Sequence, residues 1–143
     1  MTDFLVMPDL EAVVRKAIAD AGFRAYTSIP NSPVWPLSVV HRGGGFPAER
    51  RYLDAARIQI DVWGSARGDV TPVPKSQLHD EAQNVRVAVL RLEGRKVTFT
   101  GGGAFVSGVE DGPGLQWLPD DETGRERYLM TMIVYGRSLL TGE

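Results

Sequence analysis

The chain has no cysteine in its 143 residues. Disulfide bonds, thiolate nucleophiles and thiolate metal ligands are therefore excluded. An excess of charge of one sign is also missing, because 16 basic and 18 acidic residues leave a formal net charge of -2. Such a chain has no field that would by itself hold nucleic acid or an anionic membrane. No apolar run approaches the roughly 20 residues that a membrane helix needs, and no signal peptide is recognised at the start.

Motifs of catalysis and ligand binding are missing as well. Neither His41 nor His79 belongs to a His-Glu-x-x-His pattern, which a zinc-binding helix would need. The glycine runs at residues 43–45 and 101–103 do not lead into Gly-Lys-Ser/Thr, so a hairpin turn or loop is a better interpretation than a phosphate cradle. The acidic residues 120–122 lack the spacing of a calcium loop, which favours a solvated turn. The sequence thus predicts no catalytic residue, no cofactor and no metal site.

Two segments have the apolar spacing of amphipathic helices. In residues 10–21 the apolar side chains recur at i, i+3, i+4, i+7, i+8 and i+11, which gives one apolar stripe. In residues 75–93 they step by four and three along a narrow seam. Gly22 and Gly94 follow these segments and suit helix ends. Each helix is therefore expected to pack through one face.

Alternation of apolar and polar residues predicts strands in the rest of the chain. The clearest is residues 56–63, where Ile58, Ile60 and Val62 form one apolar face. The other face carries Arg57, Gln59, Asp61 and Trp63. Further strands are expected at residues 23–29, 37–41, 96–100, 104–109, 115–118 and 127–135. Residues 43–54 are interpreted as a long loop or the tip of a hairpin, because they begin with a run of glycines.

The strand at residues 127–135 is apolar on both faces, and residues 136–143 are interpreted as a tail. A strand with two apolar faces is either central in its sheet or covered by a neighbouring subunit. The order of helix, strands, helix and strands predicts an α+β fold in one domain, residues 1–143. Its simplest form is a single mixed or mainly antiparallel sheet with two amphipathic helices packed on one face. The other face is then polar or covered by a partner.

Three tryptophans occupy unusual places. Trp63 lies on the polar face of its strand, and Trp35 and Trp117 lie in loops or short strands. Large aromatic side chains at such places are candidates for interface anchors, although they can equally close the edge of their own core. Together with the long glycine-rich segment and the strand with two apolar faces, they favour a protein whose task is to contact other proteins.

A family resemblance is carried by the order of these segments. An amphipathic helix precedes the strand ARIQIDVWG at residues 56–64, which is followed by a Gly/Pro loop, a helix at residues 76–92 and the strand at residues 127–135. In this order and length the chain resembles the tail-terminator (tail-completion, minor tail protein U-like) proteins of siphophages. The Arg-x-Gln-x-Asp-x-Trp strand is the most characteristic part of the resemblance.

The resemblance implies a structural virion protein and not an enzyme. Such a protein forms a ring, with six subunits expected, that caps the phage tail tube, ends its polymerisation and forms the joint to the head or neck. Its partners would be copies of itself, the major tail-tube protein and the head–tail connector or neck proteins. DNA would pass through the lumen without specific binding, and no membrane is involved. The protein would be assembled in the host cytoplasm and reside in the virion tail.

Contacts between subunits are expected in three places. These are the loop at residues 43–51, the outward face of the strand at residues 56–63, and the Gly/Pro-rich loop at residues 64–74, where the alternative for each loop is a mobile solvated turn. A closed ring requires heterologous contacts whose rotation closes. The candidate interface residues are Phe46, Arg50, Arg51, Arg57, Gln59, Asp61, Trp63 and Arg67.

Three other functions stay open on the sequence. The nearest is another connector of a phage particle, such as a head-closure or neck protein. A small cytoplasmic enzyme would use Asp61, His41 or the acidic residues 120–122, and perturbed carboxylates that converge in a pocket would favour it. The third is a small binding module encoded in a bacterial operon.

Overall fold

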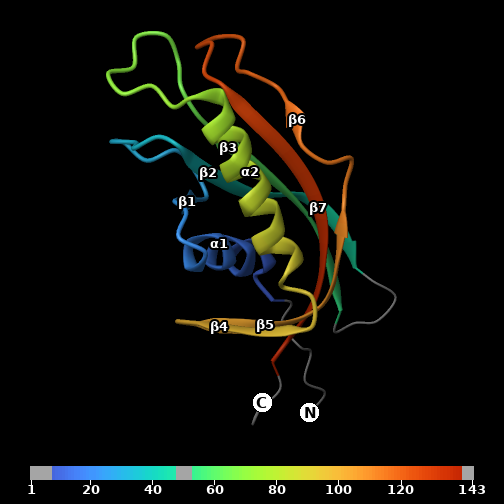
Figure 1. The fold of residues 1–143 in the computed structure, drawn as a ribbon. Helices are drawn as coiled ribbons and strands as arrows, with labels where there is room; N and C mark the ends of the chain where they lie inside the picture. Colours follow the sequence, from blue (N-terminus) through green and yellow to red (C-terminus); the bar gives the residue numbers. More distant parts are fainter. Residues whose placement is uncertain (1–7, 48–52, 140–143) are drawn as a thin grey trace, which may run out of the picture.

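The computed structural model describes residues 8–47 and 53–139. Its helices are α1 (Leu10–Asp20) and α2 (Lys75–Leu90). Its strands are β1 (Ala25–Tyr26), β2 (Leu37–Pro47), β3 (Asp54–Trp63), β4 (Arg95–Phe99), β5 (Gly102–Asp111), β6 (Gln116–Trp117) and β7 (Arg127–Ser138). The helices form one layer and the strands a curled sheet (Figure 1), so the chain has the α+β fold that the sequence predicts.

The strands form one mixed sheet in the order β1-β2-β3-β7-β5-β4. Only β1 and β2 are parallel, and the other pairs are antiparallel. One edge of β7 pairs with β3 over residues 127–136. Its other edge pairs first with β6, at residues 128–129, and then with β5, at residues 132–138. Of the two positions predicted for the strand with two apolar faces, the central one is therefore correct.

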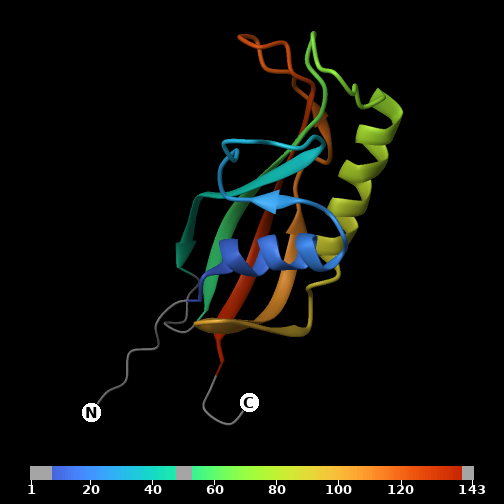
Figure 2. The ribbon, with the colours of Figure 1, turned by 90° about the vertical axis from the view of Figure 1, so that its left-hand side faces the viewer.

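Both helices pack on the same face of the sheet (Figure 1, Figure 2). Helix α1 begins after Asp9, whose side chain accepts a hydrogen bond from the Ala12 N–H at 3.0 Å. This cap satisfies one of the backbone donors that a helix leaves free at its start. The side chains that the helices bury are Leu10, Val13, Val14 and Ile18 of α1 and Leu78, Ala82, Val85 and Val89 of α2. These are the apolar stripes predicted from the sequence.

The core lies between the helices and the central strands. The sheet contributes the buried side chains Ile58, Ile60 and Val62 from β3 and Met130, Met132 and Val134 from β7. Full burial of one such side chain contributes roughly 1.5–3 kcal/mol to the free energy of unfolding. Packing against this sheet, rather than helix propensity alone, therefore stabilises α1 and α2.

Both ends of the segment at residues 43–54 belong to strands, and residues 48–52 lie outside the described residues. β2 continues to Pro47, β3 begins at Asp54 and these two residues pair, so the hairpin interpretation is correct and a loop that starts at residue 43 is wrong. A bulge between Arg42 and Gly45 lets β2 continue through the glycines. Gly44 has a φ of 130° there, a conformation that favours glycine. The Arg42 guanidinium donates two hydrogen bonds to the Asp54 carboxylate, at 2.5 and 2.9 Å, and ties the two strands together.

Other boundaries also differ from those predicted: β4 is shifted by one residue, β5 begins within the glycine run that was interpreted as a turn or loop, and β6 has only two residues. β1 is only two residues long, α2 ends at Leu90, and β7 continues to Ser138, so residues 136–138 are strand and not tail. Gly136 lies within this extension of β7, and a Cβ at this position would lie 2.6 Å from Leu10 Cδ2. Glycine here lets the first residue of α1 pack directly on the strand.

Candidate interaction surface

The face of the sheet that carries no helix presents the predicted polar side of β3. The alternation of β3 places Arg57, Gln59, Asp61 and Trp63 there, with the apolar residues of the strand buried on the helix side. Arg57 is exposed, Gln59 and Trp63 are half-buried, and Asp61 is only 5% exposed. The four residues thus share a face, as predicted, but the exposed fraction that a partner could contact differs between them.

Asp61 is held by its own neighbours. Gln59 Nε2 donates a hydrogen bond to Asp61 Oδ1 at 3.0 Å. Arg127 Nη1 lies 3.8 Å from Asp61 Oδ2, and the same guanidinium lies over the Trp63 ring, 4.7 Å from its centroid. A buried carboxylate with a cation and an amide beside it has its charge compensated within the chain. Asp61 therefore positions Gln59 and Arg127 on this face.

A hollow of about 510 Å³ lies on the same face. Its lining residues are Gly43, Arg57, Gln59, Glu110, Asp111, Gly112, Pro113, Thr131 and Ile133. Glu110 Oε1 accepts a hydrogen bond from the Tyr135 hydroxyl at 2.9 Å, and this bond raises the pKa of Tyr135. Within the described part of the chain, Arg57 has no hydrogen-bond or ion-pair partner. The hollow is therefore lined both by an unpaired guanidinium and by the half-buried apolar side chain of Ile133.

Each tryptophan lies under a cation of the same chain. The pairs are Arg125 over Trp35 at 3.8 Å, Arg127 over Trp63 at 4.7 Å and Lys75 over Trp117 at 4.1 Å from the ring centroid. Trp35 packs against the core, whereas Trp117 is 38% exposed. These cation–π contacts give the indole rings partners within the chain. They favour the alternative in which the tryptophans close the edges of their own core.

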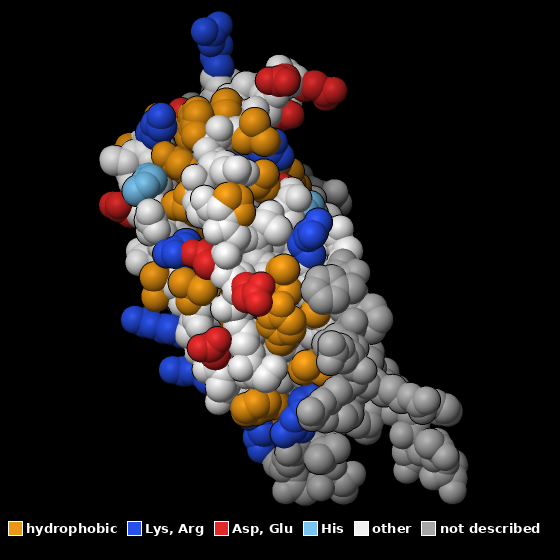
Figure 3. Space-filling view, turned by 90° about the vertical axis from the view of Figure 1, so that its right-hand side faces the viewer, with side chains coloured by type: hydrophobic (Ala, Val, Ile, Leu, Met, Phe, Trp, Pro, Cys, Tyr) orange, Lys and Arg blue, Asp and Glu red, His pale blue; other side chains and the backbone are white. Residues whose placement is uncertain are grey.

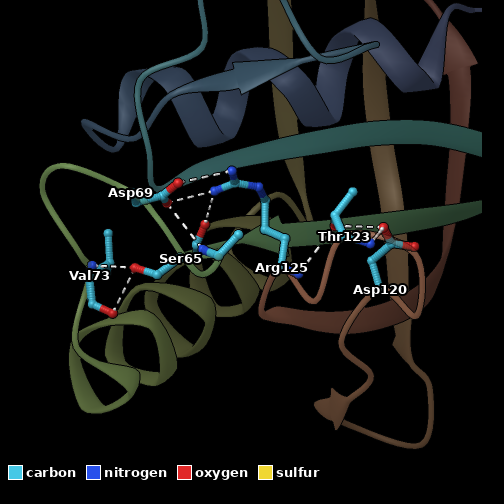
Figure 4. Close-up of polar contacts among 8 residues, drawn as sticks. Ser65, Asp69, Val73, Asp120, Thr123 and Arg125 are labelled. Carbon is cyan, nitrogen blue, oxygen red and sulfur yellow. Dashed lines mark hydrogen bonds and ion pairs between the residues drawn. The ribbon is translucent and has the colours of Figure 1, made fainter.

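The loop at residues 64–74 is fixed by side-chain contacts (Figure 4). Arg125 Nη1 donates to the Gly64 carbonyl at 2.8 Å and to Asp69 Oδ2 at 2.9 Å. The Arg125 guanidinium and the Ala66 N–H lower the pKa of Asp69. Ser65 Oγ also exchanges hydrogen bonds with the backbone of Val73 across the loop. These contacts argue against the mobile solvated turn that was the alternative for this loop.

The turn that contains the acidic residues 120–122 stands beside this loop. Asp120 Oδ2 accepts hydrogen bonds from Thr123 Oγ1 at 2.7 Å and from the Thr123 N–H at 3.1 Å. These bonds lower the pKa of Asp120. The Gly124 N–H donates to the Asp120 carbonyl at 2.8 Å, with Gly124 at a φ of 71°. Asp120 thus closes its own turn, in keeping with the interpretation of this segment as a turn.

The other predicted interface residues have separate positions. Arg67 is exposed in the loop at residues 64–74. Phe46 belongs to β2 and pairs with Ala55 of β3. Arg50 and Arg51 lie outside the described residues. The structure thus brings Arg57, Gln59, Asp61 and Trp63 onto one surface, and places Arg67 in a different segment.

Two of the residues named for an enzyme make side-chain contacts within the fold. Asp61 binds Gln59 and Arg127, and Asp120 closes its turn. His41 is half-buried in β2, paired with Gln59. Within residues 8–47 and 53–139, no group of three or more histidine and acidic side chains is placed to hold a metal ion.

Comparison with known proteins gives no assignment. Neither the models of known protein families nor the curated proteins include a match to this chain. Of the two helices in the described residues, neither is long and apolar enough to cross a membrane. The candidate surface therefore rests on the geometry of the chain itself.

Proposed function

We propose that the chain is a structural virion protein that caps the tail tube of a siphophage as a ring. In this role it ends tube polymerisation and forms the joint to the head or neck. It resides in the virion tail after assembly in the host cytoplasm, and it acts by binding rather than by catalysis. The segments that carry the resemblance to tail terminators, residues 10–21, 56–64, 76–92 and 127–135, all belong to the one sheet and its two helices, which is the support that the fold gives.

One observation carries the proposal: within the described residues, the helices cover one face of the sheet and leave the other without a helix (Figure 2). The opposite face presents the free Arg57 guanidinium and the half-buried Ile133 side chain around a hollow of about 510 Å³. A mixed polar and apolar surface is compatible with a protein interface, which is on average about as apolar as the rest of a protein surface. Sister subunits of a ring, and the last ring of the tube, are the partners proposed for it.

The mechanism is geometric. A subunit that matches the tube on one side, and offers no copy of the growing face on the other, ends polymerisation. Each subunit in a ring uses two different surfaces, one for each neighbour. The net charge of -2 suits a lumen through which DNA passes without being held, because tight phosphate contacts would retard it.

The test uses the purified protein and tail tubes of the phage that encodes it. Light scattering measures the mass of the protein alone and with tubes, and electron microscopy then images the tube ends. We expect ring-sized masses on tube ends and no further tube growth. Tubes that keep growing in excess protein, with bare ends, would reject the proposal. Capture by portal or adaptor protein in place of tube protein would assign a head-closure or neck connector.

Trp63 provides a residue-level test of the open face. Wild-type and Trp63→Ala subunits are mixed and the mass of the assembled rings is measured. Trp63 anchors a subunit contact if the mixture forms fewer rings. Unchanged assembly would restrict Trp63 to its contact with Arg127.

A further inference from the structure

A second hollow, of about 410 Å³, lies on the helix side of the molecule. It is bounded by α1, by the end of α2 and by β4. Its charged lining residues are Lys16, Asp20, Arg91, Arg95 and Lys96, and we call this site the basic hollow. Four cations from three elements thus surround one concave site, although the chain as a whole is slightly acidic.

Three of these cations are free to bind a partner. Lys16 Nζ lies 2.8 Å from Asp20 Oδ2, so these two charges cancel. Arg91, Arg95 and Lys96 are exposed and have no hydrogen-bond or ion-pair partner among the described residues. Unpaired charges of one sign around a concave surface concentrate the field there and attract groups of opposite sign. The basic hollow therefore fits an anionic partner.

Two structural roles account for only part of this charge. Basic residues on an edge strand discourage pairing with other chains, which suits Arg95 and Lys96 because β4 ends the sheet. A cation at a helix C-terminus interacts favourably with the helix dipole, which suits Arg91. Neither role requires the side chains to gather around one hollow with Lys16 of another helix.

The matching acidic surface lies at the opposite end of the same chain. The turn at residues 120–122 is at the top of Figure 1, whereas β4 and the end of α2 are in the lower half. Asp121 and Glu122 are exposed, and their carboxylates have no hydrogen-bond or ion-pair partner among the described residues. Acidic side chains project at this upper end in Figure 3. We call residues 120–122 the acidic turn.

The acidic turn is held in one shape. Asp120 bonds to Thr123 within the turn. The next residue but one, Arg125, fixes the base of the turn to Asp69 and to the Gly64 carbonyl (Figure 4). A preorganised turn loses little conformational entropy on binding. Asp121 and Glu122 are thus presented as two carboxylates on a rigid projection.

We propose that the basic hollow binds the acidic turn of a second copy of this chain. Asp121 and Glu122 of one copy then face Arg91, Arg95 and Lys96 of the next, in a head-to-tail contact. This contact rests on the ring proposed above and names one of the surfaces by which its subunits meet. It is heterologous, since each copy offers a different end to each neighbour.

The test reverses the charge on each side separately. The turn variant carries Asp121→Lys and Glu122→Lys, and the hollow variant carries Arg95→Glu and Lys96→Glu. All four side chains are exposed, so both variants are expected to fold, as circular dichroism and thermal melting will check. Asp80→Lys, an exposed acidic position on α2, is the control for a change of net charge elsewhere. Self-association is measured by sedimentation velocity at low and high salt.

The expected result is reciprocal. Wild type and Asp80→Lys associate, more weakly at high salt because salt screens the charges. Each reversal variant alone associates at least about tenfold more weakly, because like charges then meet at the contact. An equal mixture of the two variants recovers association, since in every contact of an alternating assembly opposite charges meet again. Because the two variants have net charges of opposite sign, recovery counts for this contact only if it exceeds the association of the turn variant with a variant carrying Arg15→Glu and Arg67→Glu, which reverses two exposed cations outside the basic hollow.

Three results would overturn the contact. One is wild type that stays monomeric at low salt up to about 1 mM. Another is a mixture that associates no better than either variant. The third is a pair of results: wild type binds short duplex DNA and the hollow variant does not, while the hollow variant self-associates as wild type does. The basic hollow would then be a phosphate site. The tube-capping assay tests the proposed function separately. If the protein caps tubes but this contact is absent, the contact is rejected and the proposed function stands. If the contact forms but the protein does not cap tubes, the proposed function is rejected.

Discussion

Arg125 and Asp69 lie 56 positions apart in the sequence and form an ion pair with an Nη1–Oδ2 distance of 2.9 Å. The pair joins the segment before β7 to the loop at residues 64–74. The Arg125 guanidinium also lies over Trp35, so one side chain connects three loops at the end of the molecule. The first two predictions concern this pair.

Replacing Arg125 by Ala removes the ion pair, the hydrogen bond to the Gly64 carbonyl and the contact with Trp35. We expect the free energy of unfolding to fall by about 1–2 kcal/mol, because charged hydrogen-bond partners are left unpaired. Urea denaturation measures the change. Arg67→Ala is the matched control, since Arg67 is an exposed arginine of the same loop region. Equal effects of the two substitutions would contradict the role given to Arg125.

The stability that Asp69 contributes depends on pH. Its folded-state pKa is lowered, first by the hydrogen bond from Arg125 and then by the Ala66 N–H. A lowered pKa stabilises the fold above the unfolded-state pKa, and this contribution is lost as the pH falls through the folded-state pKa. Asp69→Asn should therefore destabilise the protein at about pH 7 and lose its effect below about pH 4. Thermal melting measures the difference between the two proteins, and a difference that is the same at about pH 7 and at about pH 2 would reject the prediction.

The pH dependence that Glu81 gives to stability is opposite to that of Asp69. It lies half-buried on α2, and its Oε2 has no hydrogen-bond partner among the described residues. Burial raises the pKa of Glu81, and the charge of Arg24 only partly opposes this. A raised pKa favours folding below the unfolded-state pKa, and this benefit is lost as the pH rises through the folded-state pKa. Glu81→Gln should thus raise the melting temperature by a few degrees at about pH 7 and leave it unchanged at about pH 3. No gain at neutral pH would count against it.

Gly112 follows β5 and lines the hollow on the open face. A Cβ at this position would overlap the carbonyl oxygen of Thr131 in β7. Because backbone cannot move aside as a side chain can, Gly112→Ala is expected to cost about 1–3 kcal/mol of stability. Gly43 lines the same hollow, and a Cβ there would have nothing within 4 Å. Gly43→Ala is therefore the control. Chemical denaturation measures the free energy of unfolding of both variants.

Apolar periodicity predicted the main elements well. Each of α1, α2 and β3 packs through one face. The spacing of apolar residues in these elements therefore predicted which side chains are buried. The order of the strands was not predicted, since pairing of β3 with β7 joins residues far apart in the chain. The bulge at Arg42 was missed because glycine runs are as common in turns as in bulged strands.

The candidate surface was predicted in part. Period-two alternation placed Arg57, Gln59, Asp61 and Trp63 on one face, but it carries no information about what lies over that face. Arg127 covers Trp63 and compensates Asp61 from another strand, and only the strand register reveals this. The one available signal was an arginine that begins β7 next to an apolar run.

β7 occupies the middle of the sheet although it follows every other strand along the chain. The β2–β3 and β4–β5 hairpins can form as soon as they leave the ribosome, but no strand joins them until β7 is made. A nascent or truncated chain that stops before residue 127 thus carries two strand edges with unpaired backbone groups, which invite aggregation. Completion of the sheet waits for the slowest, most distant pairings.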